Sequence, residues 1–230
     1  KAATNLALVG KTEGTNFTNS LLVGHATTGT LNAAENNTGV GIDALNSITS
    51  GDRITAVGYN AGTSITTGNA STFIGANAGK TFSTASSNTG VGDSSLFTSN
   101  ASSNTGIGQN SGYHLTGAEN TAIGASSLQS SAGAGSGARN TAIGQAAGTA
   151  ITSGNNNIFL GQDGGKNITS GDGNVIIGTV DAASATGDRQ LLITGYDGST
   201  STTWISGDSS GNLVTPGTIT ANGVVLAGGG

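Results

Sequence analysis

NTAIGASSL, at residues 120–128, returns as NTAIGQAAG at residues 140–148. Related five-residue phrases occur along most of the chain. They close on glycine at Gly24, Gly41, Gly58, Gly75, Gly92, Gly108, Gly124, Gly144, Gly161, Gly178 and Gly195. The intervals between these glycines are 17, 17, 17, 17, 16, 16, 20, 17, 17 and 17 residues, and we expect LALVG, ending at Gly10, to be an earlier copy. A period this regular predicts a chain built from stacked units.

The composition excludes several protein classes. The chain has 230 residues, with 41 glycines, one proline, 8% charged residues and a net charge of −5. The low charge and the recurring Val and Ile argue against disorder, and glycine does not fall at every third place as in collagen. Seven scattered Lys and Arg residues form no basic stripe, so we expect no nucleic-acid partner. No apolar run of about 18 residues is present, so we expect no membrane insertion. Without cysteine there are no disulfides or thiolate metal sites.

Two positions of each copy carry branched residues. The position before the glycine is Val, Ile or Leu in most copies, and the position three before it is mostly Thr, as in Thr89-Gly90-Val91-Gly92. Alternate residues of a strand share a face, and both positions favour β-branched types. We therefore expect this face to point into the core.

The position between them is restricted to small or apolar residues, namely Gly39, Ala56, Phe73, Gly90, Gly106, Ala122, Ala142, Phe159 and Ile176. A strand position that faces solvent is normally free to be polar, so this restriction predicts a second surface packed against it. Oligomerisation explains this economically. The alternative is that small residues suit a narrow solenoid.

Turn residues follow each glycine, and a second apolar position lies seven residues after it, for example Ile48, Ile65, Phe82, Leu115, Ile151 and Ile168. Each unit is thus expected to hold two short strands and two tight turns. The prediction is an all-β fold, a β-solenoid or β-roll of about 11–12 turns with repeats of about 17 residues. The Asn that opens most copies should stack as an amide ladder. The 20-residue step carries SSAGAGSGAR, which should bulge from one side without altering the core.

The expected division is a repetitive solenoid over residues 1–195 and a capping or stem segment over 196–230, leading to a further C-terminal region. The start at Lys1, without Met, suggests a processed or trimmed chain. The single tryptophan, Trp204, is suited to cap the last turn. Its alternative role is an aromatic platform for a glycan.

Other candidate sites are weak. GANAGKT, at 75–81, lacks one residue of the phosphate-loop spacing, and two histidines are too few for a zinc site. Asp43, Asp93 and Asp163 offer oxygen ligands for calcium at a corner, although turn chemistry explains them more simply. We predict no catalytic, cofactor or metal site.

The NTAIG and NTGVG phrases resemble the head repeats of trimeric autotransporter adhesins and repeats in tail fibres of bacteriophages, cyanophages included. The resemblance covers about residues 5–195, and the closing WISGDSSGNLVTPGTITANG is similar to segments that follow the shaft of phage fibres. It implies a parallel homotrimer exposed on a virion or cell surface and used for attachment.

We therefore expect a non-enzymatic tail-fibre protein in the virion tail, which spaces or presents a surface for a host glycan or protein receptor. Its partners would be two further copies of itself and other tail proteins. A bacterial surface adhesin on the cell surface, and a polysaccharide-degrading tailspike, are the alternatives.

Overall fold

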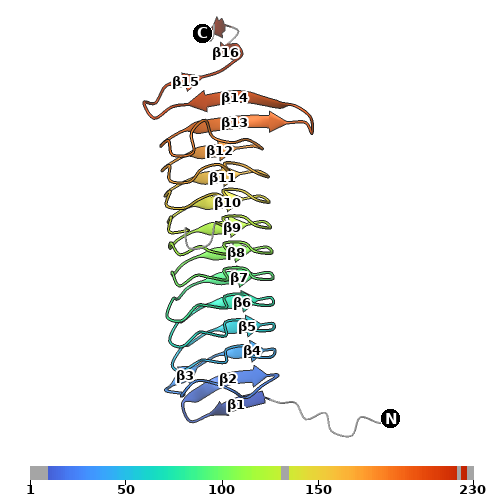
Figure 1. Cartoon of the computed structure of the whole chain (residues 1–230), viewed down its shortest axis with the longest axis vertical. Helices are drawn as coiled ribbons and strands as arrows, with labels where there is room; N and C mark the ends of the chain where they lie inside the picture. The colour runs from blue at the N-terminus through green and yellow to red at the C-terminus, as the bar shows by residue number, and fades with distance from the viewer. Residues whose placement is uncertain (1–9, 131–134, 222–223, 227–230) are drawn as a thin grey trace, which may run out of the picture. The chain divides into compact units, whose positions relative to one another are not determined.

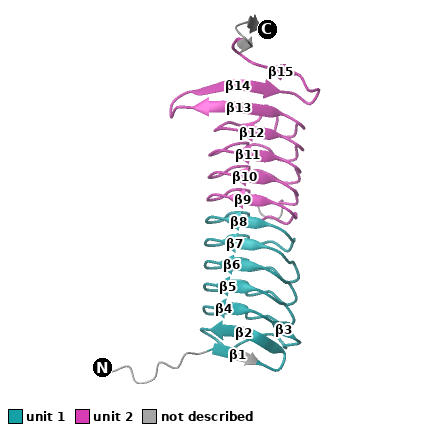
Figure 2. Ribbon diagram, turned by 180° about the vertical axis from the view of Figure 1, so that it is seen from behind, with its two compact units in different colours: residues 1–113 teal, residues 114–230 magenta. Residues whose placement is uncertain are grey.

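The computed structural model describes residues 10–130, 135–221 and 224–226. The chain is an all-β β-solenoid of about ten turns with repeats of about 17 residues (Figure 1). Its residues fall into two compact units, 1–113 and 114–230, coloured separately in Figure 2.

Unit 1 holds one strand pair at its start and then a parallel ladder. Its strands are β1 (Gly10–Gly14), β2 (Phe17–Val23), β3 (Ala34–Glu35), β4 (Thr38–Val40), β5 (Thr55–Val57), β6 (Thr72–Ile74), β7 (Thr89–Val91) and β8 (Thr105–Ile107). From β2 through β4 to β8 each strand pairs in parallel with the next, and equivalent positions are partners, such as Thr72 with Thr89. β1 instead pairs antiparallel with β2, with Gly10 opposite Val23. The expectation that Gly10 closes a further copy is therefore wrong.

Unit 2 continues the same repeat and ends in antiparallel strands. Its strands are β9 (Thr121–Ile123), β10 (Thr141–Ile143), β11 (Ile158–Leu160), β12 (Val175–Ile177), β13 (Leu191–Tyr196), β14 (Ser201–Gly207), β15 (Leu213–Val214), β16 (Ile219–Ala221) and β17 (Val224–Leu226). β9 to β13 pair in parallel, and β14 then pairs antiparallel with β13. Antiparallel elements at both ends explain why the turns number about ten rather than 11–12. The predicted boundary at residue 195 falls inside β13.

The core lies on the opposite strand face from the one predicted. Counting the opening Asn as position 1 and the closing glycine as position 5, position 3 is buried in every repeat strand from β4 to β12, while positions 2 and 4 are half-buried or exposed. Position 1 shares the face of position 3 and is buried too. The small residues at position 3 therefore fill a narrow interior, as the alternative interpretation held.

Large core side chains lie over glycines of neighbouring turns. A Cβ at Gly90 would come within 3.0 Å of the Phe73 ring, and one at Gly106 would come within 2.9 Å of Leu96. Phe73 also packs against Phe82, with ring centroids 5.0 Å apart. Because a close-packed interior tolerates no extra volume, the bulk of Phe73 and Leu96 is matched by glycine at position 3 of the following turn.

The second strand predicted for each unit is not formed. Residues around Ile48, Ile65 and Ile168 are turns and bends, although these side chains are buried. Left-handed residues such as Asp43 (φ 60°) and Leu45 (φ 56°) curve this half of each turn too tightly for a strand. Each turn thus consists of one three-residue strand and a long run of turns.

The predicted Asn ladder is present. In unit 2 the Asn140 and Asn157 Nδ2 groups each donate to the Oδ1 of the preceding Asn, at 3.2 and 2.9 Å, and Asn174 donates to Asn157 at 2.9 Å. The same Oδ1 atoms accept the next backbone N–H groups, for example Asn157 N–H to Asn140 at 3.0 Å. In unit 1 the ladder is mixed, since Ser20 and Ser71 replace Asn and accept the next backbone N–H. These bonds satisfy polar groups buried inside the turns.

The insertion between β9 and β10 leaves the strand register intact. Ala122 pairs with Ala142 as in any other step. Leu115 forms a parallel bridge with Gly135, and the Ser130 hydroxyl donates to the Ile151 carbonyl at 2.8 Å. The predicted bulge itself includes residues 131–134, which lie outside the described residues.

Candidate functional site

The outward face of each parallel ladder carries two regular columns. Thr at position 2, replaced by Ile158 in β11 and Val175 in β12, and Val, Ile or Leu at position 4 point away from the core. In unit 1 Ile74 is 41% exposed and Ile107 is 40% exposed, and Val40 lies in the same column. In unit 2 the position-4 column includes Ile143 and Leu160, which are also exposed. The result is a row of apolar side chains on the free face of each sheet.

A second ladder, which the sequence interpretation missed, lies on the surface two residues before position 1 of the next turn, which is position 16 of a 17-residue turn. The Asp172 Oδ1 accepts the Asn155 N–H at 2.6 Å, and the Asp188 Oδ1 accepts the Asp172 N–H at 2.8 Å. In unit 1 the Asn69 Oδ1 likewise accepts the Asp52 N–H at 2.7 Å. Here each Oδ1 accepts a backbone N–H of the turn before it, whereas the Oδ1 of each buried Asn accepts a backbone N–H of the turn after it. Recurrent Asp, Asn and Ser at position 16 are the signal in the sequence.

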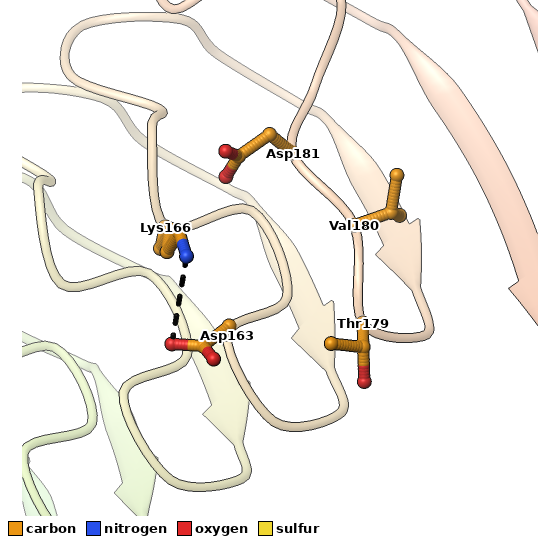
Figure 3. A pocket seen from close by; sticks show the side chains of 5 residues that line it. All are labelled: Asp163, Lys166, Thr179, Val180 and Asp181. Carbon is orange, nitrogen blue, oxygen red and sulfur yellow. Dashed lines mark ion pairs between the residues drawn. The ribbon is translucent and has the colours of Figure 1, made fainter. Parts of the chain in front are cut away.

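The carboxylates considered for calcium, those of Asp43, Asp93 and Asp163, contact side chains of their own turns. Figure 3 shows Asp163 beside Lys166, with an Nζ–Oδ1 distance of 3.9 Å, and Asp181 on the following turn. The Asp43 Oδ1 accepts the Asn46 amide at 2.8 Å, and Asp93 accepts the Ser94 hydroxyl at 3.2 Å. Over the residues that the structure describes, no three His, Cys, Asp or Glu side chains gather as a metal site requires. The geometry therefore favours turn chemistry at these corners.

His25 also has a local role. It is buried, its Nδ1 accepts the Thr27 N–H at 3.2 Å, and its Nε2 lies 2.7 Å from the Ala44 carbonyl oxygen. The ring thus ties the first turn of unit 1 to the next one.

In the described part of the chain, no helix is long and apolar enough for a bilayer crossing.

Trp204 lies on the β13–β14 hairpin and is 58% exposed, so its indole is not buried over the last turn as a cap. β14 has an extra residue at this point, because Ile193 pairs with Ile205 and Thr194 with Thr203. The indole packs over Gly195, where a Cβ would come within 2.5 Å of its Cζ2 atom. The paired strands β13 and β14, rather than the indole, extend the sheet beyond β12.

Two grooves meet at Trp204. The smaller one has a volume of about 300 Å³ and is lined by Gly195, Tyr196, Asp197, Thr200, Thr202 and Trp204. The larger, about 590 Å³, lies between Thr202–Ile205 and Thr215–Thr218 and is mainly apolar. Figure 1 and Figure 2 both show β13 and β14 running past the turns of β9–β12, so the tip of the hairpin projects sideways. Of this site the sequence interpretation named only Trp204.

Asp197 closes the tip of the hairpin. Its Oδ1 accepts the Thr200 N–H at 2.7 Å and the Ser199 N–H at 2.9 Å. The hydrogen bond from Thr200, followed by that from Ser199, lowers the pKa of Asp197 below its ordinary value. The carboxylate is therefore ionised at neutral pH.

The lowered pKa predicts that acid loosens this tip. A carboxylate with a depressed folded-state pKa stabilises the fold fully above its unfolded value of about 4, and the stabilisation is lost as pH falls through the folded value. We expect the Thr200 and Ser199 amide resonances to shift as the pH falls below about 4, and their exchange protection, corrected for the intrinsic exchange rate at each pH, to fall, measured by NMR. In Asp197→Asn the acceptor oxygen stays but cannot titrate, so the same amides should lose this pH dependence. An equal response in both proteins would contradict the assignment.

No protein-family model, curated protein or solved structure gives a significant match to this chain. What the molecule itself shows is a β-solenoid repeat protein.

Proposed function

We propose that this chain is a structural shaft protein of a bacteriophage tail fibre, assembled as a parallel homotrimer, which spaces or presents a host-binding surface. The single observation that carries the assembly is the outward apolar column. Parallel sheets are almost always covered on both faces. Here one face packs on the core, and the other exposes branched aliphatic side chains at one place in each turn.

A further copy of the same chain fits this face well. Two copies share the same turn spacing of about 4.8 Å, so their Thr and Val/Ile columns match along the whole contact. The face carries no charged residue in these two columns from β4 to β12, so such contact leaves no charge unpaired. The viral role is supported by the resemblance of the NTAIG-type repeats and the closing segment to phage fibres. Many weak contacts along a fibre add up to firm attachment.

Charges placed on this face should disrupt assembly. In the double variant Ile74→Lys, Ile107→Lys, two ammonium groups would be buried between copies. Each is expected to cost about 2 kcal/mol or more, roughly a 30-fold loss in the association constant. Sedimentation analysis should show a three-chain species for the parent protein and single chains for the variant.

The matched control is Thr67→Lys, Thr84→Lys, which adds the same charge at exposed positions outside the sheet face. It should keep the three-chain mass. A parent protein that sediments as a single chain at all concentrations would refute the trimer, and equal behaviour of the two double variants would refute this face as the interface.

Electron microscopy of the native particle would separate a fibre on a virion from an adhesin on a bacterial surface. The enzymatic alternative, a polysaccharide-degrading tailspike, predicts new reducing ends when the protein is incubated with host capsule. A shaft protein produces none.

A further inference from the structure

The smaller groove at the hairpin combines aromatic and hydroxyl chemistry. Trp204 is 58% exposed and Tyr196 is 53% exposed, and both line this groove. Trp204 can lie so close to the strand backbone because Gly195 has no side chain beneath it. Two exposed aromatic rings in one groove provide a broad apolar surface at a small entropic cost.

Polar groups border these rings. The hydroxyls of Thr200 and Thr202 line the groove together with Asp197. Both amide hydrogen bonds to Asp197 are received by Oδ1, so Oδ2 remains able to accept from a ligand. An apolar floor with a few placed polar groups is the usual composition of a ligand site.

The charge of the groove restricts the ligand. Neither this groove nor the larger apolar one beside it contains a Lys or Arg side chain, and the one charge present is the ionised Asp197. Sulfate, phosphate and carboxylate groups would meet repulsion without compensation. A neutral ligand with hydroxyl donors fits these groups.

We propose that this groove binds a neutral saccharide. A pyranose ring has C–H groups on its faces and hydroxyls at its rim, so it matches the Trp204 and Tyr196 rings on one side and Asp197, Thr200 and Thr202 on the other. The lining residues Gly195–Asp197 follow the part of β13 that pairs with β12, so the groove lies beyond the three-residue strand face of β12. The inference rests on the proposed attachment function for its biological role, and it names the chemistry of the receptor.

The sole tryptophan makes the test specific, because the intrinsic tryptophan emission of the protein comes from this groove alone. Labelled protein is applied to a printed array of neutral and anionic glycans, and the neutral glycans retained are then titrated while Trp204 emission is recorded. We expect retention on neutral glycans and a saturable change in emission. Tyr196→Ala keeps the reporter and should weaken binding about tenfold, as loss of one aromatic contact does. Trp204→Ala should abolish retention on the array.

Leu213→Ala is the matched control, since Leu213 is 68% exposed on β15 and lines neither groove. It should bind as the parent does, and circular dichroism should show all variants folded. Retention on no glycan, or on anionic glycans only, overturns the inference. So does emission that is shielded from quencher in the assembled protein and unresponsive to sugars, because Trp204 would then be covered by another copy. These results leave the sedimentation test of the trimer untouched, so the two proposals can fail separately.

Discussion

Gly92→Ala is expected to destabilise unit 1 by about 2–5 kcal/mol, although it adds a single methyl group. Gly92 has φ +130°, a conformation that side chains of L-residues rarely adopt. A Cβ there would also come within 2.6 Å of the carbonyl carbon and oxygen of Gly108 in the next turn. Those atoms are backbone, so no side-chain rotation relieves the clash. Thermal and denaturant unfolding, with hydrogen exchange of the peptides around β7 and β8, measures the loss.

Two control variants separate the causes of this loss. Gly14 has no atom within 4 Å of an added Cβ and no positive φ, so Gly14→Ala should be nearly neutral. Gly198 has φ +96° and equally open space, so Gly198→Ala reports conformational strain alone. If Gly92→Ala were no more destabilising than Gly198→Ala, the close stacking of these glycines would not limit the fold. Because each turn contacts only its neighbours, exchange should rise first in β7 and β8.

Asn157→Leu is expected to cost roughly 3–6 kcal/mol, because it removes the partners of three buried groups. The Asn157 Oδ1 accepts from Asn174 N–H at 2.8 Å and from Asn174 Nδ2 at 2.9 Å. Its own Nδ2 donates to the Gly171 carbonyl at 2.9 Å and to the Asn140 Oδ1 at 2.9 Å, and this Oδ1 keeps the Asn157 backbone N–H in the variant. Leucine has similar size but none of these bonds, so each group left behind is buried without water. Chemical denaturation of the parent and variant gives the difference in stability.

Gln162→Leu is the comparison, because Gln162 is exposed on the same turn. It should change stability by no more than about 0.5 kcal/mol. Asn157→Leu unfolding at the same denaturant concentration as Gln162→Leu would show that the buried ladder is not needed for stability.

The repeat itself was predictable because identical turns need identical residues at identical places. The glycine at position 5 and the Asn at position 1 were correctly interpreted from spacing alone as far as β12. At β13 the prediction of Gly195 as the closing glycine is wrong, because the pairing with β12 places Thr194 level with Gly178. Which face of each strand is buried was predicted wrongly. Alternation shows that Thr89 and Val91 share a face, but it does not show whether that face points into the core. A usable signal was present: Phe73 and Phe159 at position 3 coincide with Gly79 and Gly165, and a Cβ at either glycine would clash with the phenylalanine ring of its turn.

The candidate saccharide groove could be predicted only in part. Trp204 was noticed because it is unique, but nothing in the spacing indicates that Tyr196 lies in the same groove. Their proximity depends on the antiparallel register of β13 and β14 and on the extra residue in β14. Asp197 and Gly198 lie in the four-residue loop between Tyr196 and Ser201, so this Asp-Gly pair was a local sign of a hairpin but not of its register. The surface ladder at position 16 was missed because polar residues in turns were attributed to turn chemistry alone.

The buried Asn ladder of unit 2 also determines whether the chain could lose or gain a whole turn. Each Asn presents the same atoms to the turn on either side, so residues 140–156 form an interchangeable module. Deletion of these residues would bring Asn157 directly onto Asn120, with the amide partners conserved. The register therefore accommodates the loss or gain of a whole turn, while the lateral surface keeps the same pattern.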